Sequence, residues 1–301
     1  MKLKKQTKET IQIIAFFLIA GAAIFFYMVY PLNRTKALMG RPNLDDYNER
    51  TDSVIANDDS LWIVHGLNPD TFRVETDGLT ALACLRCKPQ DSAIGTVIIL
   101  HNDRETRDSV LPLALAFWSS GYAVITYDQR ASGRSSGNYS GDGWYEANDL
   151  KEIIAYLNLR NELVHPVYVI GFGLGADAAI LSALDENRID AVAAMDPYLT
   201  TDRWLEIQKS KSGMLWYPFW KTITWWYYNL RSSYAALYRD IEVIQGVRVP
   251  TMLFVEQALL NDPEVLKIKE LSSDSLLTIH PTPFDESGKL DRILEFVKSR
   301  K

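Results

Sequence analysis

The sequence predicts an α/β fold with a mostly parallel central sheet and helices on both faces. From about residue 69 to the end of the chain, strand-like apolar runs alternate with helical segments. The runs are apolar throughout, as in strands covered on both sides, and do not alternate between apolar and polar residues. Two strands around the turn pair Asp77-Gly78 begin the series, and this hairpin makes the sheet mixed.

The expected elements follow one another in a regular order. After the hairpin strands at 71–76 and 79–87, buried strands are expected at 95–101, 122–128, 166–172, 189–196, 250–256 and 275–280. Helices are expected at 109–121, 145–159, 174–184, 263–271 and 289–299. The helix at 145–159 has apolar residues on a single face, at Ala147, Leu150, Ile153, Ile154 and Leu157. The sequence thus divides into residues 69–301 as the folded domain and a preceding segment of different character.

That preceding segment predicts a membrane anchor. Residues 1–9 are basic, and the run from Thr10 to Tyr30 carries no charge. About 20 apolar residues in a helix cross a hydrocarbon core of roughly 30 Å. The run is longer than a signal-peptide core and no small-x-small site ends it, so we expect an anchor that is not removed. Residues 31–68 are polar and irregular and are expected to form a tether, with short helices as an option.

The charges beside the anchor predict its orientation. Four lysines precede the span and three cations follow it: Lys2, Lys4, Lys5 and Lys8, then Arg34, Lys36 and Arg41. This bias favours a cytoplasmic N-terminus, with the bulk domain on the non-cytoplasmic side, periplasmic or extracellular in a bacterium.

Composition excludes some classes of partner. After residue 41 the chain holds 25 Lys/Arg against 37 Asp/Glu, so nucleic acid is not an expected partner of the domain. The two cysteines, Cys84 and Cys87, lie three apart in an expected strand, face opposite sides, and are interpreted as structural. His101 and Asp103 are two metal-ligand types on one loop, too few for a metal site, and loop structure is the favoured interpretation. No metal or cofactor is expected.

The stretch "VIGFGLGADAA" places Gly171, Gly173 and Gly175 directly after a strand and at the start of a small-residue helix. It lacks the last glycine of a dinucleotide-binding motif, where Ala176 stands. Together with "HNDR", "YDQRASGRSSG" and "YEANDLKEIIAYL" in this order, it makes residues 71–300 resemble the α/β-hydrolase family, in its lipase-like and peptidase-like branches. In that family the glycine-rich turn is the nucleophile elbow, whose central residue is a serine.

The resemblance implies a catalytic triad that this sequence departs from. Gly173 stands at the nucleophile position, and Leu259 stands at the usual acid position. Asp196 or Asp262 is a possible replacement for the acid, and His280 is the single late histidine, at a strand end. The resemblance also implies an oxyanion hole built from the Leu174 N–H and a donor from the loop at Asn102. A structural interpretation of Gly173 is that glycine adopts the strained elbow conformation without steric cost.

Residues 198–248 interrupt the alternation where family members carry a cap over the site. This insert is rich in aromatic side chains, among them Trp216, Trp220 and Trp226. Packing of a cap on the core is the first interpretation, and contact with the membrane interface is the second. Lining of a pocket for an acyl or aromatic ligand is the third.

We therefore expect a membrane-anchored binding or regulatory protein with a hydrolase-like fold and no serine-triad catalysis. The alternative is an atypical hydrolase that acts on ester, lipid or peptide substrates. A scaffold of the cell envelope is a second alternative. The expected partners are the membrane, through the N-terminal helix, and a small acyl or aromatic ligand or a protein.

Overall fold

The structure is a computed structural model. It describes residues 2–39, 60–78, 80–141, 143–200, 202–204, 206–207, 221–226, 230, 244–271, 276–283 and 286–300. These ranges contain the whole sheet and the elbow, while most of the aromatic insert lies outside them.

Within the described residues, eight strands form one sheet in the order β1-β2-β4-β3-β5-β6-β7-β8. Their bounds are β1 Pro69–Thr76, β2 Thr80–Cys87, β3 Thr96–Leu100, β4 Ala123–Tyr127, β5 Val167–Phe172, β6 Ala191–Met195, β7 Thr251–Val255 and β8 Leu277–Pro281. The β1–β2 and β2–β4 pairs are antiparallel and every later pair is parallel. The predicted mixed but mostly parallel sheet is confirmed.

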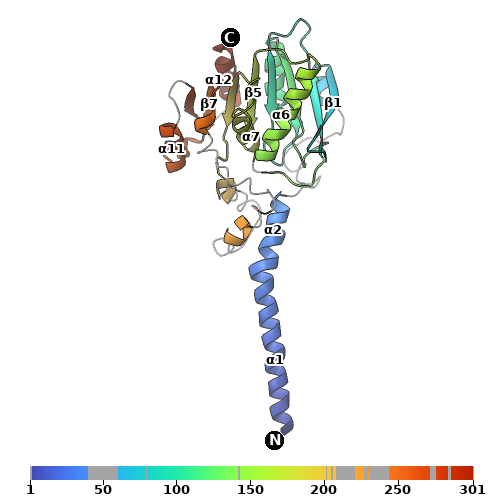
Figure 1. Ribbon diagram of the computed structural model, residues 1–301, viewed down its shortest axis with the longest axis vertical. Coiled ribbons are helices and arrows are strands. Elements are labelled where there is room, and N and C mark those ends of the chain that lie inside the picture. Colours follow the sequence, from blue (N-terminus) through green and yellow to red (C-terminus); the bar gives the residue numbers. More distant parts are fainter. Residues whose placement is uncertain are drawn as a thin grey trace.

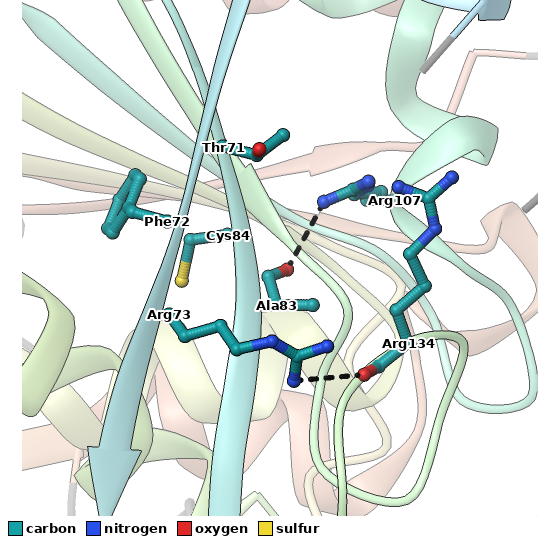
Figure 2. A pocket seen from close by; sticks show the side chains of 7 residues that line it. All are labelled: Thr71, Phe72, Arg73, Ala83, Cys84, Arg107 and Arg134. Atoms are coloured by element: carbon teal, nitrogen blue, oxygen red, sulfur yellow. Dashed lines mark hydrogen bonds between the residues drawn. The ribbon is translucent and has the colours of Figure 1, made fainter. Parts of the chain in front are cut away.

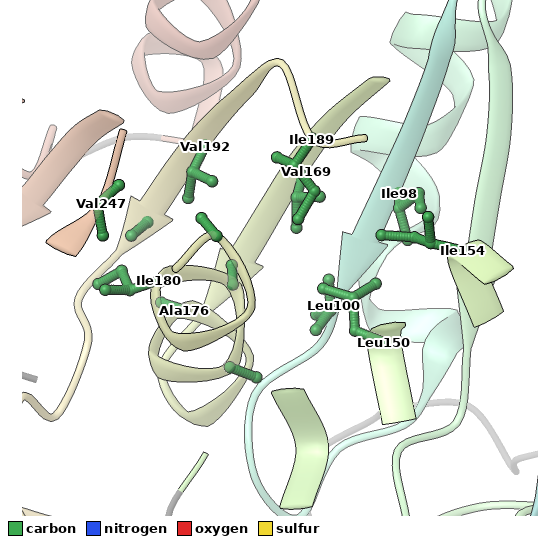
Figure 3. Packing of buried hydrophobic residues seen from close by; sticks show 14 of the residues in the cluster. Ile98, Leu100, Leu150, Ile154, Val169, Ala176, Ile180, Ile189, Val192 and Val247 are labelled. Carbon is green, nitrogen blue, oxygen red and sulfur yellow. The ribbon is translucent and has the colours of Figure 1, made fainter. Parts of the chain in front are cut away.

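Helices cover both faces of this sheet, as expected for strands whose side chains are buried on both sides. On one face α6 (Trp144–Leu159) and α7 (Leu174–Ser182) pack on the strands, in a cluster that Figure 3 shows. On the other face α5 (Leu111–Ser119) and α12 (Glu286–Lys298) supply the apolar side chains. Helix α11 (Pro263–Leu271) lies between β7 and β8 in the chain (Figure 1). The strands of the centre are fully buried, so the carboxyl ends of β3, β5 and β6 are held as one rigid edge.

The N-terminal segment is a long helical rod that projects from the domain (Figure 1). It comprises α1 (Lys2–Ile24), a π-helical turn η1 (Phe25–Val29) and α2 (Tyr30–Met39). The helical stretch Lys8–Arg34 contains 18 consecutive residues with a mean hydropathy of 2.4, none of them buried, so by length and composition it suffices to cross a membrane. The helix passes Pro31 because the widened turn before it relieves the clash of a proline ring with the preceding turn.

The packed domain begins earlier than the sequence predicts. Helix α4 (Ser60–Val64) falls in the range 31–68, interpreted above as a tether, and its Trp62 is fully buried. The indole N–H of Trp62 donates to Asp108 Oδ1 at 2.7 Å. Leu67 is buried in the same cluster. Because a buried tryptophan contributes a large apolar area, the packed domain begins at α4, through Trp62 and Leu67. Residues 40–59 of the expected tether lie outside the described residues.

The two cysteines are free and buried in β2. Cys84 packs in the cluster on the α6 and α7 face, and Cys87 packs in the cluster on the α5 and α12 face. Their side chains therefore point to opposite sides of the sheet, as the strand period predicts.

Candidate functional site

The elbow turn has the strained backbone of a nucleophile position although it carries no side chain. Gly173 lies between β5 and α7 with φ +51° and ψ −116°, a region that residues with a Cβ rarely adopt. Its N–H donates to Met195 O at 2.9 Å, and its carbonyl accepts from the Ala176 N–H at 2.9 Å. The turn is thus tied to β6 and to α7, and glycine occupies it without the usual steric penalty.

The two flanking glycines are required for close packing of the helix on the sheet. A Cβ on Gly171 would lie 2.1 Å from Gly175 O, and a Cβ on Gly175 would lie 2.6 Å from His101 O. Neither distance is compatible with a real side chain. The elbow glycines at 171 and 175 therefore bring the first turn of α7 against β5 and against the loop that follows β3.

Asn102 fills the space that a nucleophile side chain would need. A Cβ built on Gly173 would lie 1.8 Å from Asn102 Oδ1. The same oxygen accepts from the Leu174 N–H at 3.3 Å and from the Asp103 N–H at 2.8 Å. Leu174 and Asp103 thus supply two converging N–H donors. The carboxamide oxygen of Asn102 occupies the position where a substrate oxyanion would be bound.

This geometry corrects the expectation that Asn102 supplies a donor to the oxyanion hole. Asn102 enters the site as an acceptor, and the N–H group that accompanies Leu174 belongs to Asp103. The physical reason is that a glycine at position 173 leaves a gap beside two backbone donors. A short carboxamide one residue before the second donor can satisfy both of them.

The start of the insert is fastened over the elbow. The Tyr198 and Leu199 N–H groups each donate to the buried Asp177 carboxylate of α7 at 3.0 Å. The Tyr198 hydroxyl lies 2.8 Å from Asp103 Oδ1 and 3.1 Å from Asn102 Oδ1, so its proton serves either oxygen. Burial raises the pKa of Tyr198, which keeps this hydroxyl a donor at neutral pH. Tyr198 therefore holds the loop after β3 against the elbow.

A pocket of about 400 Å³ opens beside the turn, and we refer to it as the elbow pocket. Its polar lining residues are Asn102, Glu105, Ser109, Asp196 and Lys289. Its apolar lining residues are Val110, Pro112, Leu113, Phe172 and Met195, and Gly173 also lines it. A cavity of this size with both kinds of lining suits a small amphiphilic molecule.

Among the possible replacement acids, Asp196 is the one at the elbow pocket. It follows β6, and its Oδ1 accepts from the Thr282 hydroxyl at 2.5 Å. Burial raises the pKa of Asp196, and the hydrogen bond from Thr282 opposes that rise. Thr282 comes directly after β8, where the family resemblance places a histidine. Sequence reasoning missed Thr282, because a threonine after a strand carries no signal of its own.

His280 lies within β8, before the position that a catalytic base would need. Its ring centroid is 5.8 Å from that of Phe254 on the neighbouring strand. Burial lowers the pKa of His280, and nearby Arg292 adds to the effect. In the part of the chain that the structure describes, no hydrogen bond joins His280 to Asp196 or to Asp262. The two aspartates and this histidine are not brought together as a triad.

Leu259 and Asp262 belong to the connection between β7 and α11. Leu259 ends a short 3₁₀ turn, Gln257–Leu259, and is half-buried. The Asp262 carboxylate accepts from the Glu264 N–H at 2.9 Å, which caps the N-terminus of α11. Neither residue lines the elbow pocket, so Asp262 has a structural role in the helix end.

His101 is held between its own loop and the turn after β4. Its Nε2 accepts from the Gln129 N–H at 2.9 Å, and its Nδ1 lies 2.6 Å from Asn102 O. Over the described ranges, no group of three or more His, Cys, Asp or Glu side chains has an arrangement that could hold a metal ion. Both ring nitrogens of His101 thus lie within hydrogen-bond distance of neighbouring groups.

A buried ionic network supports the turn after β4. Arg130 pairs with the fully buried Asp149 of α6, with Nη2 2.6 Å from Oδ1 and Nε 2.7 Å from Oδ2. Thr76 donates to the same carboxylate at 2.7 Å. Nearby Glu146 is also buried, and its Oε1 accepts from the Gly141 N–H at 2.7 Å. Burial raises the pKa of Glu146 to about 7. The network is structural, since none of these residues lines the elbow pocket.

Of the tryptophans singled out in the insert, Trp216 and Trp220 lie outside the described residues. Trp226 lies on a helical stretch over 221–226 and is 57% exposed, with Trp225 beside it at 38%. Lys221 of the same stretch pairs with Asp202 at 2.8 Å. The described part of the insert contributes no strand to the sheet. The strands that precede and follow the insert in the chain, β6 and β7, pair directly with each other.

Comparisons with known proteins agree with this architecture. The esterase of Pyrococcus furiosus superposes with a TM-score of 0.65 at 20% identity, covering 79% of this chain and 93% of the esterase. The α/β-hydrolase GrgF from a Penicillium species superposes with a TM-score of 0.60 at 18% identity, covering 78% and 99% of the two chains.

A third solved structure resembles the chain over nearly its whole length. It is described as a membrane phospholipase A, a bacterial virulence factor, and it superposes with a TM-score of 0.58 at 14% identity. The superposition covers 97% of this chain and 99% of the phospholipase. No curated protein sequence matches the chain. In sequence, residues 91–256 match the family described as serine aminopeptidase, S33. The chain therefore belongs to the serine aminopeptidase S33 family within the α/β-hydrolase superfamily.

Proposed function

We propose that the protein is a membrane-anchored pseudohydrolase, which binds a small amphiphilic ligand in the elbow pocket and performs no serine-triad catalysis. The observation that carries this proposal is the position of Asn102. Its side-chain oxygen occupies both the nucleophile's space beside Gly173 and the acceptor position of the oxyanion hole. A site in which both places are taken by one side chain favours binding over acyl transfer.

The chemistry of acyl transfer supports the same conclusion. A serine triad needs a nucleophile, a base within hydrogen-bond reach and an acid that orients the base. Gly173 has no side chain, and Thr282, which cannot accept a proton at neutral pH, donates to the pocket's aspartate. Ser109 in the pocket donates to Glu105 Oε2 at 3.0 Å. Among the described residues, no histidine lines the elbow pocket.

The anchor proposal rests on the helical rod at the N-terminus. Its apolar stretch is exposed along its length and follows a basic segment, which supports insertion with the N-terminus in the cytoplasm and the domain outside. The likeness to a membrane phospholipase A spans this rod as well as the domain. We infer that the ligand is acyl-bearing, because the elbow pocket, with its apolar lining residues, has room for part of a hydrocarbon chain.

An atypical hydrolase is the second candidate. Asp196 favours it, because this carboxylate lines the elbow pocket and burial raises its pKa toward the range of a general base. In that case Asp196 would activate a water molecule, and the neutral carboxamide of Asn102 would have to leave the oxyanion position. Loss of turnover in an Asp196→Asn variant distinguishes this candidate from the first.

Binding of lauric acid to the full chain in detergent micelles tests the ligand proposal. We expect saturable binding by isothermal titration, weakened about tenfold in Leu113→Gln, because a polar side chain replaces an apolar wall of the pocket. Leu266→Gln is the matched control, since Leu266 is 44% exposed on α11. Equal affinity in all three proteins, or no binding at all, contradicts the proposal and favours the scaffold alternative.

A further inference from the structure

A second cavity lies beside the β1–β2 hairpin. It has a volume of about 380 Å³, and three of its seven lining residues are arginines, Arg73, Arg107 and Arg134 (Figure 2). We refer to it as the arginine cavity. It shares no lining residue with the elbow pocket. Arg107 lies in the chain between Glu105 and Ser109, which line the elbow pocket, so the two cavities have separate linings on neighbouring residues.

The strand register explains why these side chains converge. Arg73 of β1 pairs with Ala83 of β2, so both side chains stand on the same face of the hairpin. Thr71, two residues before Arg73, shares that face. Phe72 points to the opposite face, where its ring stacks on Tyr156 of α6 at 5.3 Å. The open side of the hairpin thus presents one guanidinium, one hydroxyl and one methyl group to the cavity.

The other two arginines are placed by a single carboxylate. Asp128, directly after β4, accepts from the Arg107 N–H at 2.9 Å through Oδ1 and from the Arg134 N–H at 3.0 Å through Oδ2. Arg107 begins the short turn η2 (Arg107–Val110), and Arg134 lies in the turn that follows β4. Because both backbones are fastened to one side chain, their guanidinium groups reach the cavity from fixed positions.

The bonds within the cavity run to backbone oxygens. Arg73 Nη1 lies 3.5 Å from Arg134 O, and Arg107 Nη1 lies 3.4 Å from Ala83 O (Figure 2). Arg107 is buried, with 3% of its surface exposed. Among the described residues that line the cavity there is no carboxylate, while Asp108 interacts electrostatically with Arg107 and Arg134. In a domain with 25 basic and 37 acidic residues after position 41, this is a local concentration of positive charge.

We propose that the arginine cavity binds the phosphate group of a phosphate ester. Guanidinium forks match phosphate oxygens in geometry and charge, and three of them line this cavity. The Thr71 hydroxyl adds a further donor at the rim. The cavity is several times larger than a bare phosphate ion, so it has room for the organic part of the ester. The source of that ester is a soluble metabolite or a lipid head group.

Titration of the full chain tests the proposal in two arms. In the first arm, glycerol 3-phosphate is titrated into the protein in neutral detergent micelles. In the second, phosphatidic acid is added to the protein in phosphatidylcholine nanodiscs. Binding in the first arm identifies a soluble ester, and binding in the second arm alone identifies a lipid head group. We expect saturable binding in one arm that weakens as sodium chloride rises.

The matched variants are Arg73→Gln and Arg134→Gln, with Arg248→Gln as a control at an exposed arginine elsewhere. Each cavity variant should bind roughly tenfold more weakly, the loss expected for one charge-assisted hydrogen bond. The control should bind like the parent. Circular dichroism shows whether each variant is folded. Because there are two cavity variants, the test remains decisive if one of them fails to fold. Equal affinity in all four proteins overturns the proposal, as does the absence of binding in both arms.

Discussion

Replacement of Gly173 by serine tests how the elbow is built. The added Cβ would lie 1.8 Å from Asn102 Oδ1, so the Asn102 side chain must leave the oxyanion position. The Leu174 and Asp103 N–H groups then lose their acceptor, at about 1–3 kcal/mol. A residue with a Cβ at φ +51° adds about 1–3 kcal/mol of backbone strain. The free energy of unfolding should therefore fall by about 2–6 kcal/mol.

Thermal unfolding of the full chain in detergent measures this loss. For a domain of this size, the melting temperature of Gly173→Ser should fall by roughly 5–20 °C. The double variant Asn102→Gly/Gly173→Ser should recover part of the loss, because the space beside residue 173 is then open. Neither variant should react with a fluorophosphonate, since no base faces the new hydroxyl.

Two results would refute this reasoning. A Gly173→Ser variant as stable as the parent shows that Asn102 does not occupy the elbow. Covalent labelling at residue 173 shows that a working base faces the turn, and His280 would then be the first residue to mutate.

Three further predictions concern other parts of the molecule. The folded-state pKa of Glu146, about 7, exceeds its ordinary value of 4.5, so stability should fall as pH rises between these values. Glu146→Gln should remove this pH dependence and be about 3 kcal/mol more stable than the parent at pH 8, as measured by chemical denaturation at several pH values. A parent whose stability does not change between pH 4.5 and 7 contradicts this. Trp62→Phe should cost about 1.5–3 kcal/mol, because the Asp108 carboxylate loses its indole donor, and equal melting temperatures would exclude Trp62 from the core. Mass spectrometry of the mature protein should find peptides from residues 1–30, whereas a mature terminus near Asn33 would show that the anchor is removed.

Much of the fold could be predicted from the sequence because it depends on patterns that are local. Continuous apolar runs such as 96–100 and 123–127 predict buried strands, and the period of residues 145–159 predicts α6. The start of the domain was harder to predict from the sequence. Trp62 lies in a short apolar run after a long polar segment, and its hydrogen-bond partner Asp108 is 46 residues away in the chain.

The candidate site was predictable in its backbone and not in its side chains. Three alternating glycines after a strand identify the elbow, because close approach of α7 demands them. The direction of the Asn102 carboxamide depends on tertiary contacts. A sequence does not show whether an asparagine side chain will donate through its NH₂ group or accept through its oxygen. The hydrogen bond from Thr282 to Asp196 joins residues 86 apart and has no local signal.

Steady-state hydrolysis by the parent protein tests the central claim most directly. The full chain in detergent would be assayed with 4-nitrophenyl esters, a phospholipid and an aminoacyl-naphthylamide, beside Asp196→Asn as the matched variant. If the elbow is a binding site, both proteins show the same rate as buffer with detergent. A rate well above that background in the parent, lost in Asp196→Asn, would contradict the account and establish a hydrolase that works without the serine.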